Sequence, residues 1–178
     1  RLLSSTHFFA QQFKGAMVKN PADYVLTAIR QFSVFQADTL AKDYNTWYRL
    51  WQKIRDLGME YYNPPQVAGW KAYFQAPLFY QTWINSTSLP IRMKYTTDLT
   101  ERGFPLGGQK YLNIDVWLLL YQIKEPLDPN LLIRVIAMLM FHQPISEKQA
   151  AKLKDVLIPG LPDYEWSIEL GDYLAAPS

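Results

Sequence analysis

The sequence contains no cysteine and only two histidines. The absence of cysteine excludes disulfide bonds, thiol nucleophiles and thiolate metal sites, but it does not identify a cellular compartment. His7 and His142 fall in different expected helices, and neither has a carboxylate one helical turn away. Metal sites need clustered ligands at fixed spacing, so the sequence predicts no metal site, and it predicts no cofactor.

Long apolar runs are also absent. The longest candidate, from Leu131 to Phe141, is interrupted by Arg134 and is shorter than the roughly 18 residues that a membrane span needs. Lys and Arg total 18 against 16 Asp and Glu, and they form no long basic run. This balance is not typical of nucleic-acid-binding proteins. The sequence therefore predicts a chain that neither spans a membrane nor binds nucleic acid.

The composition is that of a globular protein, with 49% hydrophobic and 19% charged residues in 178. A chain of this length buries roughly 70% of the surface that its unfolded form exposes. We therefore expect one compact helical domain over residues 1–178. The chain begins with Arg1 instead of Met, and its first residues resemble the middle or end of a helix. This start predicts a fragment or a processed product of a longer protein.

Apolar periodicity and helix caps predict about seven helices and no strand, and hence a mainly α fold. The clearest starts are Asn20-Pro21, Asp128-Pro129 and the capping box from Ser146 to Gln149. Seven helices are expected. One follows Asn20, one runs over 39–57, one begins at a cap within Asn85 to Ser88 and runs to about Asp98, one runs over 113–123, two follow Asp128 and Ser146, and the last runs over 163–174. The helix after Asp128 is apolar on several faces, which predicts a place at the centre of the core. Arg102 to Gly108 is expected to be a loop, a hinge or flexible tip.

Aromatic residues make up 15% of the chain. Trp47, Tyr48 and Trp51 have helical spacing, which favours core packing. Pro64-Pro65 instead fix an ordered loop, and the aromatic residues that follow it either cover the helices or line a binding groove. The candidate ligand-binding residues are Tyr62, Trp70, Tyr73, Phe74, Tyr80, Trp83, Asn85 and Arg92.

Several segments resemble the bacterial family known as domain of unknown function 1800. They are Asn63 to Trp70, Trp83 to Ser86 and Leu89 to Arg92, with upstream support from Ser4 to Phe9 and Lys19 to Val25. The resemblance implies a largely helical fold and an exported protein, periplasmic or at the cell surface. It also implies that this chain is the carboxy-terminal part, with the remainder of its own longer chain as a partner. It implies no reaction and no catalytic residue.

Three functions remain open at this point. The first is a non-catalytic helical module that binds a polysaccharide or protein ligand through the loop from Tyr61 to Trp83, because rigid prolines beside aromatic residues lower the entropy cost of binding. The second is part of a hydrolase-type enzyme whose site needs the amino-terminal region, with Arg92, Asn85 or Asp98 contributing. The third is a scaffold in which the proline loop only covers the helices.

Overall fold

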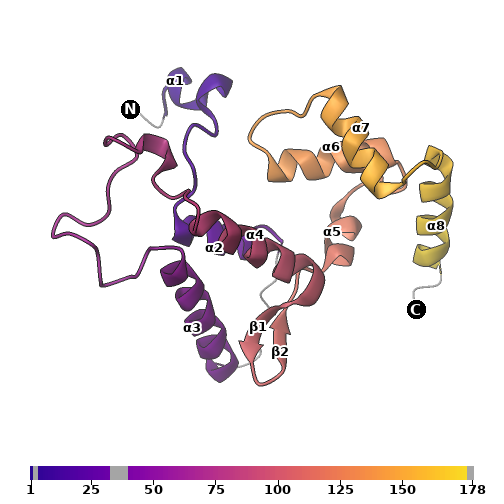
Figure 1. The fold of residues 1–178 in the computed structure, drawn as a ribbon. Helices are drawn as coiled ribbons and strands as arrows, with labels where there is room; N and C mark the ends of the chain where they lie inside the picture. The colour runs from indigo at the N-terminus through magenta and orange to yellow at the C-terminus, as the bar shows by residue number, and fades with distance from the viewer. Residues whose placement is uncertain (2–3, 33–39, 176–178) are drawn as a thin grey trace. The chain divides into compact units, whose positions relative to one another are not determined.

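The computed structural model describes residues 1, 4–32 and 40–175. Within these ranges the chain forms eight α-helices and one two-stranded sheet (Figure 1), so the predicted mainly α class is confirmed. The chain divides into two compact units. One unit is Ala16–Asp115, and the other combines Arg1–Gly15 with Val116–Ser178. Each unit has its own buried cluster of hydrophobic side chains.

The Ala16–Asp115 unit contains α2 to α4 and the sheet. Its elements are α2 (Pro21–Gln31), α3 (Leu40–Asp56), the short 3-10 helix η3 (Phe79–Gln81), α4 (Ser88–Thr97), the π-helical turn η4 (Asp98–Arg102), β1 (Phe104–Gly107) and β2 (Lys110–Leu112). The predicted start of α2 is confirmed, because the Asp23 backbone N–H donates to the Asn20 side chain at 2.9 Å. Gly58, with a φ of +93°, follows the last turn of α3.

Tyr95 lies at the centre of the buried cluster in this unit. Its hydroxyl donates to the Val25 carbonyl at 3.1 Å, and its ring meets the Phe104 ring edge to face at 5.3 Å. Leu50 and Leu99 are also fully or almost fully buried. The core therefore joins α2, α3, α4, η4 and β1 around one tyrosine.

The segment that was expected to be a loop forms a β-hairpin instead. In β1 and β2, Phe104 pairs with Leu112 and Gly107 with Lys110. The turn residues Gly108 and Gln109 both have positive φ, as a two-residue type I′ turn requires. The strands were missed because they are only four and three residues long, too short to show an alternating pattern, and because Gly-Gln is not the usual turn pair. The hairpin lies beside α3 (Figure 1), and Asn45 Nδ2 donates to the Leu106 carbonyl at 2.7 Å.

A side chain at Gly103, the residue before the hairpin, is predicted to lower the stability of the fold. Its φ is +86°, and an added Cβ would lie 2.6 Å from the Tyr111 Cβ and would overlap the Asn113 side chain. Gly58 is the matched control, because its φ of +93° is similar but a Cβ there meets nothing within 4 Å. Gly58→Ala should lower the free energy of unfolding by about 1 kcal/mol through left-handed strain alone. Gly103→Ala should cost about 1–3 kcal/mol more, because the crowded hairpin must shift.

Urea unfolding of both glycine variants, followed by tryptophan fluorescence, measures this difference. Equal losses in the two variants would show that the Tyr111 and Asn113 side chains do not restrict the space at position 103.

Trp47 and Tyr48 lie on the outer face of α3, contrary to the prediction, while Trp51 is half-buried. Trp47 and Tyr48 are each 45% exposed, while Leu50 and Ile54 are buried. Both sets have helical spacing, so periodicity alone does not choose between the two faces of the helix. The aliphatic face packs into the core, and Tyr48 and Trp51 stack on each other with ring centroids 5.7 Å apart.

The second unit is wholly helical within its described residues. Its elements are α1 (Thr6–Phe9), the 3-10 helix η2 (Gln11–Phe13), α5 (Val116–Gln122), α6 (Pro129–Met140), α7 (Glu147–Leu157) and α8 (Asp163–Ala175). The predicted caps are confirmed: the Asp128 side chain accepts from two backbone N–H groups, and Ser146 with Gln149 forms the capping box. Leu120, Leu132 and Leu170 belong to its buried cluster.

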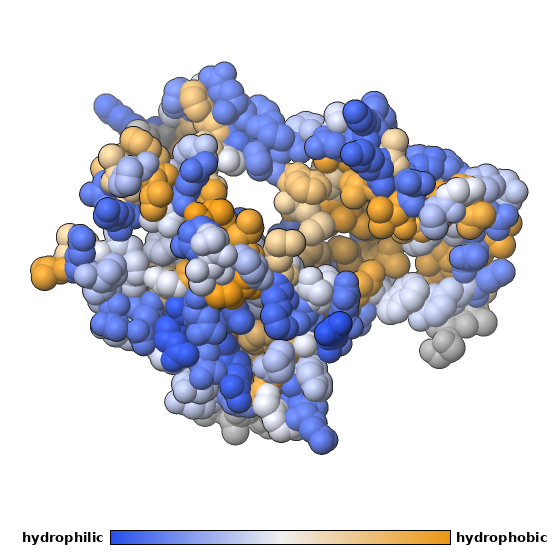
Figure 2. Space-filling view, viewed as in Figure 1, coloured by the Kyte–Doolittle hydropathy of each residue, from blue (hydrophilic) through white to orange (hydrophobic). Residues whose placement is uncertain are grey.

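The last turn of α6 is exposed, so the prediction that this helix is buried on most sides is wrong. Leu132, Ile133 and Ala137 are buried against the rest of the unit, but Met138 and Met140 face solvent. The helices α7 and α8 pack against α6 and leave part of its apolar circumference uncovered. Figure 2 shows apolar side chains gathered over α6 and α7, where a groove of about 490 Å³ lies.

Candidate binding site

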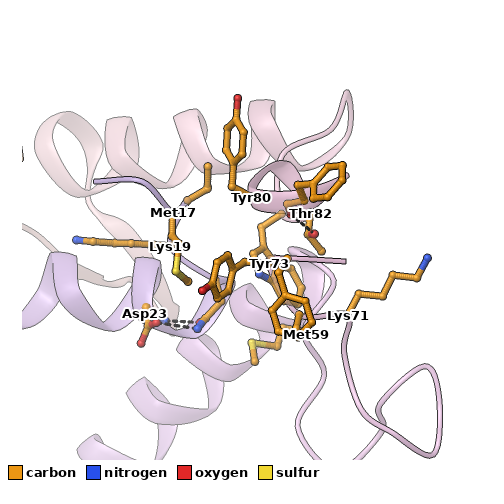
Figure 3. A pocket seen from close by; sticks show the side chains of 14 residues that line it. Met17, Lys19, Asp23, Met59, Lys71, Tyr73, Tyr80 and Thr82 are labelled. Carbon is orange, nitrogen blue, oxygen red and sulfur yellow. Dashed lines mark hydrogen bonds between the residues drawn. The ribbon is translucent and has the colours of Figure 1, made fainter. Parts of the chain in front are cut away.

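A pocket of about 430 Å³ lies within the Ala16–Asp115 unit (Figure 3). Its walls come from the segment that leads into α2, from the residue after Gly58 and from the loop before α4. The lining residues are Met17, Val18, Lys19, Asn20, Asp23, Met59, Lys71, Ala72, Tyr73, Phe74, Phe79, Tyr80, Thr82 and Trp83. We refer to this site as the aromatic pocket.

The loop wall is held by short-range hydrogen bonds. The Ala72 backbone N–H donates to the Gln75 side chain at 2.9 Å, and the Gln75 N–H donates back to the Ala72 carbonyl at 3.0 Å. The Thr82 hydroxyl donates to the Phe79 carbonyl at 2.6 Å. At the end of the loop, the Ser88 hydroxyl of α4 donates to the Trp83 carbonyl at 3.0 Å. These bonds satisfy backbone groups that a loop without strands would otherwise leave to water.

The opposite wall is held by Arg92 of α4. Its Nη2 donates to the Lys19 carbonyl at 2.9 Å, which fixes the segment that enters α2. The guanidinium carbon lies 4.5 Å from the centre of the Tyr24 ring, a cation–π contact. The Tyr24 hydroxyl in turn donates to the Arg92 carbonyl at 3.0 Å. Arg92 therefore joins α2 and α4 and positions one wall of the aromatic pocket.

Burial governs the electrostatics of Arg92. The residue is 5% exposed, and its Nε has no hydrogen-bond partner. Removal from water lowers the pKa of the Arg92 guanidinium and raises the pKa of the Tyr24 phenol. No ion pair joins Arg92 to an acid in the part of the chain that the structure describes. Its contacts are those of a structural support.

The aromatic rings of the pocket are accessible to solvent. Tyr73 and Phe74 meet edge to face at 5.6 Å, and both are exposed, as are Phe79 and Tyr80. Trp83 is half-buried at the end of the loop. Exposed apolar surface that gathers in one concave place, rimmed by polar groups, is typical of ligand-binding sites.

The charged groups lie around these rings. The Asp23 carboxylate accepts a hydrogen bond from the Asn20 side-chain amide at 2.7 Å. Lys19 and Lys71 extend to opposite sides of the pocket (Figure 3). Within the described ranges, neither lysine forms an ion pair with an acidic side chain. The two ammonium groups therefore lie on opposite sides of the rings and extend away from them (Figure 3).

Four of the eight candidate residues line this pocket, namely Tyr73, Phe74, Tyr80 and Trp83. The other four lie elsewhere. Tyr62 is fully exposed in a turn, and Trp70 is half-buried outside the lining. The Asn85 side chain accepts from the Thr87 and Ser88 N–H groups at the start of α4. Arg92 does not line the pocket, and it is connected to it by its hydrogen bond to the Lys19 carbonyl.

Sequence reasoning missed the lining residues that are distant from the loop. Met17, Lys19 and Asp23 precede or begin α2, and Met59 follows α3. No local motif marks them, because they reach the loop only through tertiary packing. The Asn20 cap fixes the direction in which the chain enters α2, and it was the one local signal near this wall.

A family model described as "Protein of unknown function (DUF1800)" matches residues 1–167. The chain belongs to the DUF1800 family. The match includes every residue that lines the aromatic pocket, so the pocket lies within the DUF1800 region of the chain. No curated protein and no solved structure matches this DUF1800 chain. Membership therefore supports the resemblance seen in the sequence and supplies no ligand or reaction.

None of the helices in residues 4–32 and 40–175 is both long and apolar enough to cross a membrane. Over the same ranges, no group of three or more His, Asp or Glu side chains is placed to hold a metal ion.

Proposed function

We propose that this DUF1800 chain is a non-catalytic binding module that holds its ligand in the aromatic pocket. The observation that carries the proposal is the convergence of Tyr73, Phe74, Tyr80 and Trp83 on one pocket with walls from distant parts of the chain. A volume of about 430 Å³ falls within the range of ligand sites. Flat rings supply contact area, and the polar groups at the rim supply orientation.

Two further features support binding over catalysis. The loop is fixed by its own hydrogen bonds, which reduces the entropy that a ligand must offset when it orders the site. The pocket lining contains a single carboxylate, Asp23, and no histidine. General acid–base chemistry of the paired-carboxylate kind needs a second acid at a defined distance. The site is therefore better suited to hold a molecule than to transform it.

A thermal-shift screen of the chain against oligosaccharides and peptides tests this function. A ligand present at 100 times its Kd should stabilise the fold by about 2.7 kcal/mol. The Tyr73→Ala/Phe74→Ala double variant should bind at least about tenfold more weakly, because both rings supply exposed contact surface. Tyr62→Ala is the matched control, since it removes a fully exposed loop tyrosine outside the pocket, and it should bind normally.

Two results would reject the proposed function. One is the absence of any stabilising ligand in the screen. The other is a stabilisation that Tyr73→Ala/Phe74→Ala retains in full, because the ligand would then bind at another surface.

A further inference from the structure

We infer that the ligand of the aromatic pocket is an acidic polysaccharide, with carboxylates that reach the two flanking lysines. This inference rests on the proposed function and specifies the ligand of the same site. It follows from three observations, which are the charge of the rim, the chemistry of the rings and the state of the loop backbone.

The charge of the rim favours an anionic ligand. Lys19 and Lys71 both line the pocket, and no described acidic residue forms an ion pair with either one. The carboxylate of Asp23 is hydrogen-bonded to Asn20 and lies in the first turn of α2, where the helix dipole already favours a negative charge. The two ammonium groups therefore remain available, and they extend outward from the rings in opposite directions (Figure 3). A chain with repeated negative groups can meet both.

The rings favour a sugar as the unit that lies between the lysines. A pyranose ring presents an apolar face of C–H groups and a polar edge of hydroxyls. Tyrosine and tryptophan divide their surfaces in the same way, into a flat apolar face and a polar tip. Tyr73 and Tyr80 are both exposed in the pocket, so their faces and hydroxyls are accessible together.

The loop backbone disfavours the main alternative, an acidic peptide. Peptides that bind in an extended form rely on unpaired backbone N–H and C=O groups of the receptor. Here the N–H groups of Gln75, Phe79 and Thr82 donate to carbonyls of the loop itself. Side chains of the loop therefore make the contacts with the ligand. Such contacts suit a ligand that is rich in hydroxyl and carboxylate groups.

The test compares acidic and neutral forms of one saccharide. Isothermal titration measures the binding of oligogalacturonate, oligomannuronate and hyaluronan fragments, each against its methyl ester, at low ionic strength. Esterification removes the charge and keeps the sugar rings. The acids should bind about tenfold more tightly than the esters, and added salt should reduce this preference.

Charge variants show whether the preference arises at the pocket. Lys19→Gln/Lys71→Gln should abolish the difference between acid and ester. Lys148→Gln/Lys152→Gln removes the same net charge from exposed positions of α7 and should leave the difference unchanged. Circular dichroism of both double variants confirms that each is folded.

The outcomes separate this inference from the proposed function. Equal binding of acids and esters, weakened by Tyr73→Ala/Phe74→Ala, would overturn the acidic class and leave a binding module for a neutral ligand. Tighter binding of polyglutamate than of any saccharide, with the same dependence on Tyr73 and Phe74, would also overturn the inference and keep the module. Binding of none of these probes would overturn the inference, and the broader screen would then decide the proposed function by itself.

Discussion

Leu99→Ala is expected to lower the free energy of unfolding by about 2–5 kcal/mol, the range for a buried leucine whose loss leaves a cavity. Leu99 is 0% exposed and belongs to the cluster that surrounds Tyr95. The other members of this cluster come from helices and from the hairpin, so several elements border the space that Leu99 fills. Urea unfolding followed by tryptophan fluorescence and by circular dichroism measures the loss.

Leu89→Ala is the matched control for the core variant. Leu89 lies in α4 of the same unit but is 46% exposed, so its removal should cost about 0.5 kcal/mol or less. A comparable loss in the two variants would contradict the placement of the core around Tyr95 and Leu99.

Arg92→Ala is expected to lower the free energy of unfolding by about 2–4 kcal/mol. The substitution removes a charged hydrogen bond to the Lys19 carbonyl and the contact with the Tyr24 ring, and it leaves a cavity between α2 and α4. Arg92→Met keeps most of the volume and removes the buried charge. Because that charge has an unpartnered Nε, a large part of the lost attraction should be offset by the desolvation that methionine avoids.

The two Arg92 variants should therefore differ in stability, with Arg92→Met losing less than half as much as Arg92→Ala. Both should weaken binding at the aromatic pocket, because Lys19 loses the donor that fixes its backbone. Equal losses of stability would mean that the hydrogen bond to Lys19 outweighs packing and desolvation. Denaturant unfolding of the three proteins in parallel measures these differences.

Local signals predicted the helix starts well. Asn20, Asp128 and Ser146 each cap a helix as their sequences indicated, because a cap is decided by two or three neighbouring residues. The choice of buried face was less predictable. In α3 an aromatic and an aliphatic stripe compete, and the aliphatic stripe with Leu50 and Ile54 forms the core. That choice depends on what packs against the helix, which a single helix sequence does not contain.

Some residues of the candidate site could also be predicted from the sequence, and others could not. Its contiguous half could be predicted, since Tyr73, Phe74, Tyr80 and Trp83 follow one another in a loop that prolines and turns keep from becoming a helix. The lining residues outside this loop, such as Lys19, could not be predicted. Lys19 enters the site through the hydrogen bond from Arg92, which lies 73 residues further along the chain. Arg92 was predicted to bind the ligand. Its observed contacts instead hold the backbone of Lys19 in place.

An NMR titration of the isotopically labelled chain shows most directly whether an acidic saccharide binds in the aromatic pocket. With oligogalacturonate as the probe, the largest shift changes should occur at the backbone N–H groups of Lys19, of Asn20 and of the residues from Lys71 to Thr82 other than Pro77, and at the indole N–H of Trp83. The same spectra report on the apolar groove of α6 and α7 as an internal comparison. Shift changes concentrated at that groove, or no shift changes at the aromatic pocket with saccharide in large excess, would show that the saccharide does not bind in the aromatic pocket.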